Sequence, residues 1–347
     1  MYSNKFWSNK KVLITGNTGF KGSWLTILLL EKGANIIGIS KKQRSGLFLY
    51  NFLKLNKKIK QYYLDISDRN KVHTVLTKER PDVIFHLAAQ PIVKESYKNP
   101  FNTLNTNING TINILETIRK INKKISFINV TTDKVYKQTN KKSFFKENNA
   151  LGGNDIYSSS KACSDIITSS YFKSFFKIRK NGIATARAGN VIGGFDWSAN
   201  RIVPDTVKAS INKTKLIIRM PKSIRPWQHV LDVVNGYILL AEKLHKKPLI
   251  FSGSWNFGPN NSSNKEVITL VKNLNNFLTT KVKIKIKKSK FHEEEKIQLN
   301  SSKSKLLLKW KPKFNFIKTI KMTAEIYNLY NAKKLNYASF IKQVNKF

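Results

Sequence analysis

The feature that most constrains the fold is a series of short apolar segments that alternate with helical stretches through the first half of the chain. Residues 11–15 (KVLIT) and 83–87 (VIFHL), for example, are apolar at nearly every position rather than at every second one. Strands of this kind are buried on both faces, and their alternation with helices is typical of βαβ units and a parallel sheet. Strands are therefore predicted at residues 11–15, 35–39, 59–64, 83–87, 125–131 and 182–187.

The turn after the first predicted strand, GNTGFKG, has the glycine spacing of a dinucleotide-binding loop. Gly16 permits the sharp exit from the strand, Gly19 lets the backbone approach a pyrophosphate, and Gly22 lets the helix pack on the strand. Thr18 and Phe20 lie in the same turn and are predicted cofactor contacts, next to the N–H groups of the helix N-terminus. An ordinary βα turn is the alternative. The strand before the turn and the helix after it favour a Rossmann-type α/β fold with a doubly wound parallel sheet.

The adenosine end of this site departs from the usual pattern. The second strand would normally end in an acid that binds the ribose hydroxyls, but here it is followed by Lys41. NAD is the expected cofactor, and NADP stays open because a lysine suits a 2′-phosphate. Asp65 and Ile66 are predicted to contact the adenine, with a helix N-cap as the equal alternative for Asp65. The small or apolar residues after the fourth strand leave room for the cofactor; these are Leu87, Ala88 and Ala89.

A tyrosine and a lysine form the predicted catalytic pair. Tyr157 and Lys161 are four residues apart in a predicted helix, so their side chains share one face. A free tyrosine is a poor base at neutral pH, and a nearby ammonium favours the phenolate. Thr132, Asp133 and Lys134 follow the fifth predicted strand and are predicted to join the pair. The lysine can also bind the nicotinamide ribose.

These motifs, in this order, resemble the nucleotide-sugar 4,6-dehydratases of the extended short-chain dehydrogenase/reductase family. The segments that carry the resemblance span residues 10–330: GNTGFKGSWL, HLAAQPIVKESYKNP, TTDKVY, YSSSKA, ARAGNVIGGFDW, RPWQHV, FHEEE and LNSSKSKLLLKWKP. Members that act on CDP-glucose are the most similar, which implies an NAD-dependent lyase of deoxysugar biosynthesis with CDP-glucose as the favoured substrate. Another nucleotide-sugar 4,6-dehydratase and a nucleotide-sugar 4-epimerase are the alternatives.

The resemblance also implies a role for each catalytic candidate. Tyr157 would take the proton of the sugar C4 hydroxyl while Thr132 binds that oxygen. Lys134 stands where related dTDP-glucose dehydratases have a glutamate, and it would help remove the C5 proton. Asp133 would protonate the departing C6 hydroxyl, and Lys161 would support the phenolate and the cofactor. A capped surface turn is the alternative for the Asp133–Lys134 pair.

Arginine clusters in the second half of the chain, although only nine of the 63 basic residues are arginine. A planar guanidinium suits a pyrophosphate, whereas ordinary ion pairs are the alternative at each position, including Arg187. The predicted substrate contacts are Gln90, Asn190, Arg201, Arg219 and Arg225.

Residues 1–187 are predicted to form the cofactor domain, completed by parts of 228–260, and residues 188–347 mainly the substrate lobe. The net charge of +43 invites a nucleic-acid partner, but lysine is spread evenly and fits an AT-rich codon bias, so no such partner is expected. The sole cysteine, Cys163, is expected to be buried. No metal is expected, because the spacing of His86, His292 and Glu293 is not that of a metal site.

Two further expectations concern the setting of the protein. No segment approaches the length of a membrane span and the N-terminus lacks a signal peptide, so the chain is expected to be cytoplasmic, with no membrane partner. The family resemblance implies a homodimer or higher homo-oligomer. The last dozen residues are expected to be loosely held.

Overall fold

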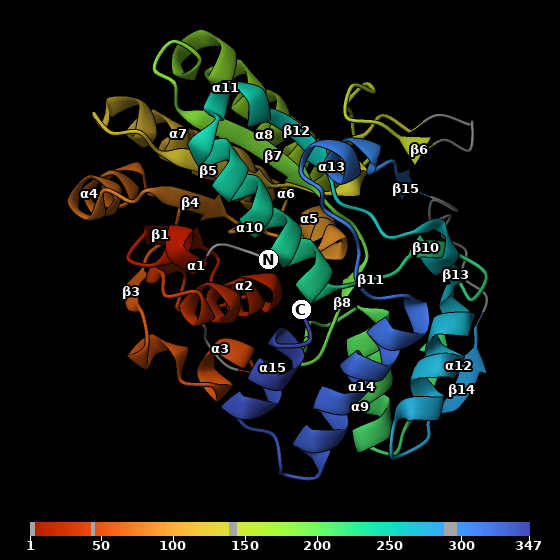
Figure 1. Cartoon of the computed structure of the whole chain (residues 1–347). Helices are drawn as coiled ribbons and strands as arrows, with labels where there is room; N and C mark the ends of the chain where they lie inside the picture. The colour runs from red at the N-terminus through yellow and green to blue at the C-terminus, as the bar shows by residue number, and fades with distance from the viewer. Residues whose placement is uncertain (1–3, 43–45, 139–143, 288–296) are drawn as a thin grey trace.

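A seven-stranded parallel sheet forms the centre of the larger lobe (Figure 1). The computed structural model describes residues 4–42, 46–138, 144–287 and 297–347, so the predicted FHEEE motif, with His292 and Glu293, lies outside the described residues. In spatial order the strands are β12 (Gly253–Asn256), β7 (Gly182–Arg187), β5 (Ser126–Val130), β4 (Val83–His86), β1 (Lys11–Thr15), β2 (Asn35–Ser40) and β3 (Lys60–Tyr63). This doubly wound order confirms the predicted Rossmann-type fold.

Helices cover both faces of the sheet, because each strand sends alternate side chains to opposite sides. Val12 and Ile14 of β1 join one apolar cluster, whereas Leu13 joins another. The first face is covered by α2 (Phe20–Glu31) and α10 (Val230–Lys246), which pack against each other. The second face is covered by α4 (Arg69–Glu79), α7 (Gly110–Lys120) and α8 (Ile156–Tyr171).

The segment from Pro100 to Lys120 is interrupted by a wider turn rather than forming one uniform helix. It begins as α6 (Pro100–Leu104), passes through a π-helical turn at Asn105–Asn109 and continues as α7. Asn107 faces inward from this turn and is 1% exposed. Its amide donates to Ser160 Oγ at 2.9 Å, and its oxygen accepts from the Gln90 N–H at 2.8 Å. The turn thus ties α8 to the loop after β4.

A smaller lobe is built from the second half of the chain, at the lower right of Figure 1. Its helices α9 (Ile202–Ile211), α12 (Val267–Phe277) and α14 (Phe316–Asn331) enclose a separate apolar cluster. The strands β9 (Lys215–Ile218) and β14 (Lys283–Ile286) pair in parallel at its surface. The other elements of this half are β8 (Val191–Ile192), β10 (Ile224–Pro226), β11 (Gln228–His229), α11 (Pro248–Phe251), β13 (Asn264–Glu266), β15 (Gln298–Leu299), α13 (Ser302–Leu307) and α15 (Tyr337–Val344).

Two expectations about burial are wrong. The end of the chain forms α15, whose N-terminus carries a capping box from Asn336 and Ser339, and Phe340 is fully buried against the main cluster. The last dozen residues are therefore packed rather than loosely held. Cys163 is exposed on α8, because it lies on the side of the helix that faces away from the sheet.

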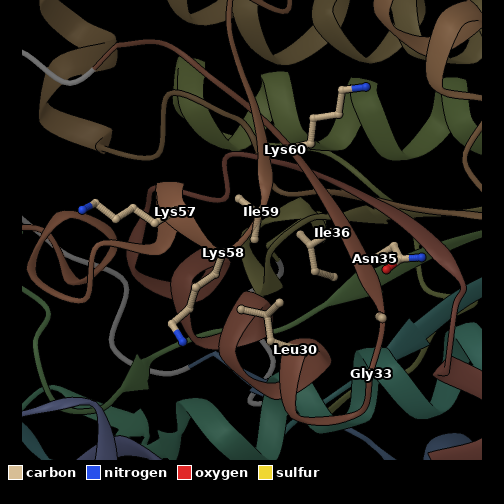
Figure 2. Close-up of a pocket in the computed structure, with 9 residues that line it drawn as sticks. Leu30, Gly33, Asn35, Ile36, Lys57, Lys58, Ile59 and Lys60 are labelled. Carbon is tan, nitrogen blue, oxygen red and sulfur yellow. The ribbon is translucent and has the colours of Figure 1, made fainter.

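A groove of about 630 Å³ opens at the amino ends of β2 and β3 (Figure 2). It is lined by Leu30 and Gly33 at the end of α2 and by Lys57, Lys58 and Lys60 before and at the start of β3. Ligands of doubly wound sheets bind at the carboxyl ends of the strands. This groove therefore lies at the opposite edge of the sheet from the predicted site.

The short elements of the first half connect these parts. They are α1 (Asn4–Trp7), α3 (Leu49–Phe52), α5 (Val93–Lys98), β6 (Phe144–Phe145) and the 3₁₀ turns Leu55–Lys57 and Asp133–Val135.

Candidate active site

The glycine turn has backbone geometry that other residues would disrupt. Gly16 has a φ of +72°, and an added Cβ would lie 2.7 Å from the Ala88 nitrogen. An added Cβ at Gly22 would overlap the Gly16 carbonyl. Gly19 is the N-cap of α2, so the turn leads directly into that helix N-terminus. Since the backbone is held this close to the loop after β4, the turn has the shape of a cradle for a dinucleotide pyrophosphate.

The adenosine end of the cradle contains an ion pair that the sequence did not suggest. Lys41, after β2, lies 2.7 Å from the carboxylate of Asp65, after β3. The pKa of Asp65 is lowered by the bonds from Lys41 and Ser67, which outweigh partial burial. Asp68, rather than Asp65, caps α4 by accepting from the Lys71 N–H. Asp65 therefore is not the helix cap that formed the alternative interpretation.

The other predicted cofactor contacts lie around the same cradle. Thr18 is buried, Phe20 is the first residue of α2, and Ile66 packs against Gly110. Residues 87–89 follow β4 and are half-buried. The Ala88 N–H donates to Thr15 Oγ1 at 3.1 Å, which fixes this loop beside Gly16.

Tyr157 lies beside Thr132 and Asp133 at the carboxyl edge of the sheet. Burial raises the pKa of Tyr157 to about 12, and the carboxylates of Asp133 and Asp155 add to this effect. The hydroxyl of Thr132 and the guanidinium of Arg201 act in the opposite direction on the same pKa. The phenol is therefore neutral at physiological pH in this structure, and it needs a cation to become a base.

Lys161 is the cation that the helix places one turn after Tyr157. Its ammonium is buried and donates to the Val130 carbonyl at 2.8 Å. Burial, reinforced by the charge of Lys21, lowers the pKa of Lys161 to about 7, whereas Asp165 acts to raise it. Near pH 7, Lys161 is therefore present in both its charged and its neutral form.

Asp133 is a buried carboxylate held against the chain after β7. It is 4% exposed and accepts a bond from Thr132 Oγ1 at 2.9 Å. Its carboxylate packs directly over the Gly189 backbone, where any larger residue would overlap it. Lys134 is half-buried, and its N–H donates to Thr132 Oγ1 at 3.4 Å. A buried carboxyl group next to a phenol brings two groups that can transfer protons into one small space.

Arg187 forms a buried ion pair behind these residues. Its side chain is 2% exposed and that of Asp165 is 1% exposed, and the two lie 2.7 Å apart. Arg187 also donates to the Tyr136 hydroxyl, while Asp165 accepts from Thr131 Oγ1. The ion-pair alternative therefore accounts for Arg187. This network links α8, which carries Tyr157 and Lys161, to the ends of β5 and β7.

The predicted substrate contacts occupy different positions around the edge of the site. Arg201, the N-cap of α9, bonds Asp196 at 3.3 Å and acts on Tyr157 electrostatically. Asn190 is half-buried after β7 and has a φ of +50°. Arg219 is exposed after β9, and Arg225 of β10 donates to the Ile224 carbonyl at 3.0 Å. All three arginines thus belong to the smaller lobe, and Arg201 is near enough to act on the charge of Tyr157.

Gln90 uses its side chain to join the loop after β4 to α6. The amide nitrogen donates to Thr103 Oγ1 at 2.8 Å, and the amide oxygen accepts from the Ile92 N–H at 2.6 Å.

The described residues offer neither a metal site nor a membrane-spanning helix. Across residues 4–42, 46–138, 144–287 and 297–347, no cluster of His, Cys, Asp and Glu is arranged to hold a metal ion. In the same ranges, no helix has the length and apolar character needed to cross a membrane.

Comparison with known proteins places this site in a family. The family model described as GDP-mannose 4,6 dehydratase matches residues 13–323. The CDP-glucose 4,6-dehydratase of Salmonella typhimurium is 36% identical over 92% of this chain and 91% of its own length. The UDP-glucose 4-epimerase of Mycoplasma genitalium is 26% identical over 92% of this chain and 97% of its own.

A solved structure agrees in fold. The dTDP-glucose 4,6-dehydratase of Bacillus anthracis, in complex with NAD, superposes with a TM-score of 0.79 at 23% identity, over 95% of this chain and 99% of that one. The fold and the order of motifs are those of extended short-chain dehydrogenases/reductases. Within that class, the chain belongs to the GDP-mannose 4,6 dehydratase family, and the predicted resemblance is confirmed.

Proposed function

We propose that the protein is an NAD-dependent nucleotide-sugar 4,6-dehydratase, a lyase that converts CDP-glucose to CDP-4-dehydro-6-deoxyglucose and water. The observation that carries the proposal is the buried Asp133 carboxylate beside Tyr157, in a chain 36% identical to a CDP-glucose 4,6-dehydratase over nearly its whole length. An acid at this point is needed to release the C6 hydroxyl. A 4-epimerase releases no group from C6 and has no use for it.

The residues present fit NAD. Gly16 and Gly22 let the turn pack closely where a side chain would collide, and the buried Lys161 ammonium uses one donor for the Val130 carbonyl, which leaves further donors for a ribose. When bound, NAD would accept a hydride from the sugar C4 and return it to C6. Lys41 is already paired with Asp65, which supports NAD over NADP.

Each proton transfer of the reaction would be carried out by a different side chain. Tyr157, made a phenolate by the Lys161 charge, would take the proton of the C4 hydroxyl while Thr132 binds that oxygen. The resulting ketone acidifies the C5 hydrogen, which Lys134 would remove. Asp133 would receive the proton that Tyr157 took from the C4 hydroxyl and pass it to the C6 oxygen as water leaves. Lys134 would return its proton to C5 when the hydride reaches C6. Arg201 and Arg225, with Asn190 and Arg219, would bind the CDP group.

In the test, the purified protein and NAD are incubated in four separate reactions with CDP-, dTDP-, GDP- or UDP-glucose. A 4-keto-6-deoxy product from CDP-glucose is expected, and a C4 epimer that keeps its C6 oxygen would contradict the proposal. Asp133→Asn should reduce dehydration by about 10²–10⁴-fold and still allow oxidation at C4, seen as reduced nicotinamide. Unchanged dehydration by this variant would exclude Asp133 as the acid.

We also propose a cytoplasmic homodimer in which residues 1–187, with parts of 228–260, bind the cofactor and residues 188–347 mainly bind the substrate. The support for a dimer is two exposed apolar side chains on helices that pack together, namely Phe101 of α6, which is 80% exposed, and Ile166 of α8, which is 48% exposed. Cys163 lies on α8 with Ile166 and is also exposed. Phe101→Glu should convert the dimer to a monomer in sedimentation experiments, and a wild-type monomer would contradict this part of the proposal.

A further inference from the structure

The paired strands β9 and β14 present a face that the proposed reaction does not use. In their parallel register Lys283 lies opposite Lys215, and Lys285 lies opposite Ile217. These four residues are exposed, because alternate residues of a strand point to opposite faces and the other set packs on the smaller lobe through side chains such as Leu216. Figure 1 shows β14 at the outer margin of that lobe.

Lysine occupies every second position along this side of β14. The row continues past the strand to Lys287, which is exposed and whose N–H donates to the Ile218 carbonyl at 3.0 Å. Residues 215–218 and 283–287 contain four lysines and no acid, although the whole chain has 20 acidic residues beside its 63 basic ones. We call this surface the basic face, and its residues are Lys215, Ile217, Lys283, Lys285 and Lys287.

The charges of the basic face repel one another. Neighbouring strands lie about 4.8 Å apart, so the side chains of Lys215 and Lys283 leave the sheet side by side, and like charges placed opposite each other are destabilising. Within the part of the chain that the structure describes, none of the four lysines lies within ion-pair distance of a carboxylate. A negatively charged partner would replace this repulsion with attraction.

Ile217 indicates which kind of anionic partner the basic face fits. Its side chain is 54% exposed between the lysines of the two strands. Single-stranded nucleic acids are bound through aromatic side chains on which the bases stack, and no residue of the basic face is aromatic. At the surface of a bilayer, an apolar side chain enters the headgroup region while neighbouring lysines attract anionic headgroups. The combination of lysines with an exposed isoleucine therefore favours a lipid surface.

We propose that the basic face binds the surface of an anionic phospholipid bilayer. Attachment of this kind needs no helix that crosses the membrane, because it relies on charge and on shallow burial of apolar side chains. The inference is independent of the proposed reaction, and the two are tested by different measurements.

In the test, the purified full chain is sedimented with vesicles of phosphatidylcholine that contain roughly one third phosphatidylglycerol, and with vesicles of phosphatidylcholine alone. The wild type should bind the first kind and not the second. The combined variant Lys215→Gln, Lys283→Gln and Lys285→Gln should bind the anionic vesicles on the order of 100-fold more weakly, since each lysine at such a surface contributes about fivefold. Equal binding of the wild type to both kinds of vesicle would contradict the proposal.

A matched control separates the basic face from the net charge of +43. The combined variant Lys57→Gln, Lys78→Gln and Lys120→Gln removes the same charge from exposed positions on other elements. Its binding should fall by less than about threefold, because exposed charges are screened beyond about 10 Å. Equal losses in the two glutamine variants would assign binding to net charge and overturn the inference.

A variant with arginine at Lys215, Lys283 and Lys285 keeps the charge of the basic face and should bind the vesicles as the wild type does. A loss shared with the glutamine variant would show that altered folding, rather than lost charge, is the cause, and would contradict the proposal.

The contribution of Ile217 is measured at roughly 0.5 M salt, where the attraction between charges is largely screened. Ile217→Ser should weaken the remaining vesicle binding roughly tenfold, the order expected for one buried aliphatic side chain. Unchanged binding by this variant would overturn the choice of a bilayer. Tighter binding of duplex DNA than of the vesicles, lost in the same glutamine variant, would instead assign the basic face to nucleic acid.

Discussion

The carboxyl edge of the sheet and the smaller lobe hold their polar side chains in different ways. At the sheet edge, His86 lies 2.7 Å from Thr15 Oγ1 and 3.1 Å from Thr111 Oγ1, and Arg187 is enclosed with Asp165. In the lobe, Arg219 is exposed and Arg201 is 37% exposed in its ion pair with Asp196. The side chains behind the proposed reacting groups are thus fixed by contacts within the fold, whereas the arginines proposed to bind the nucleotide sugar are still partly hydrated.

This difference has an energetic reason. A catalytic group acts best when its position is set in advance, because no reorganisation is then needed during the reaction. A cation that binds a phosphate must instead remain stable without it, and partial exposure lets water meet that need. We therefore expect substitutions at the sheet edge to change rates and stability, and substitutions in the lobe to change substrate affinity.

The largest effect is expected at the fixed catalytic pair. Tyr157→Phe should slow oxidation at the sugar C4 by about 10²–10⁴-fold, the usual contribution of a positioned base. Formation of reduced nicotinamide from CDP-glucose in a single turnover measures this step. The NAD dissociation constant is the control and should change little. A normal rate of reduction would show that the phenol is not the base.

The next effect concerns the network behind the pair. Arg187→Met would leave the Asp165 charge buried and unpaired, which is expected to lower the free energy of unfolding by about 3–5 kcal/mol. Urea denaturation measures this loss. The double variant Arg187→Met with Asp165→Leu should lose less than the single variant, since no unpaired charge remains. Equal losses in the two variants would show that the charge is not the cause.

The effect of pH on stability is smaller when expressed per pH unit. The pKa of Lys161 is about 7 in the folded protein and near 10.4 in an unfolded chain, so the unfolded state binds more protons between these values. Lys161 therefore contributes stability that rises with pH across this window, by up to about 1.4 kcal/mol per pH unit. The cofactor-free Lys161→Met variant should show a correspondingly flatter rise between pH 7 and 10. Parallel curves for wild type and variant would contradict the shift.

The smallest effects belong to the lobe. Arg201→Gln should raise the KM for CDP-glucose about tenfold, because one charge-assisted contact is lost, and Arg219→Gln should raise it less because that residue is exposed. Free energies of unfolding should change by less than about 0.5 kcal/mol at Arg219. If Arg201→Gln changed turnover more than KM, Arg201 would act in catalysis rather than in substrate binding.

The sequence predicted the sheet well because burial on both faces leaves a clear pattern. The strands β1 and β7 begin and end where their apolar runs do. The glycine turn and the Tyr157–Lys161 pair were also recognisable, since their spacing reflects local backbone geometry. Their roles in catalysis remain predictions.

Other features depend on partners distant in the sequence, which periodicity does not reveal. Arg187 looked like the other arginines of the second half, and only the position of Asp165 on α8 shows its ion pair. Cys163 was misjudged because an apolar character does not say which side of a helix meets the sheet.

The position of β12 has a consequence for biosynthesis. This strand comes from residues far along the chain, yet it forms the edge next to β7 and buries Trp255 completely. More than two thirds of the polypeptide must therefore leave the ribosome before β12 can pair with β7. A truncated product that stops after β7 would carry an unpaired apolar edge strand, which is prone to intermolecular aggregation. The amino-terminal segment is thus expected to be insoluble when expressed alone.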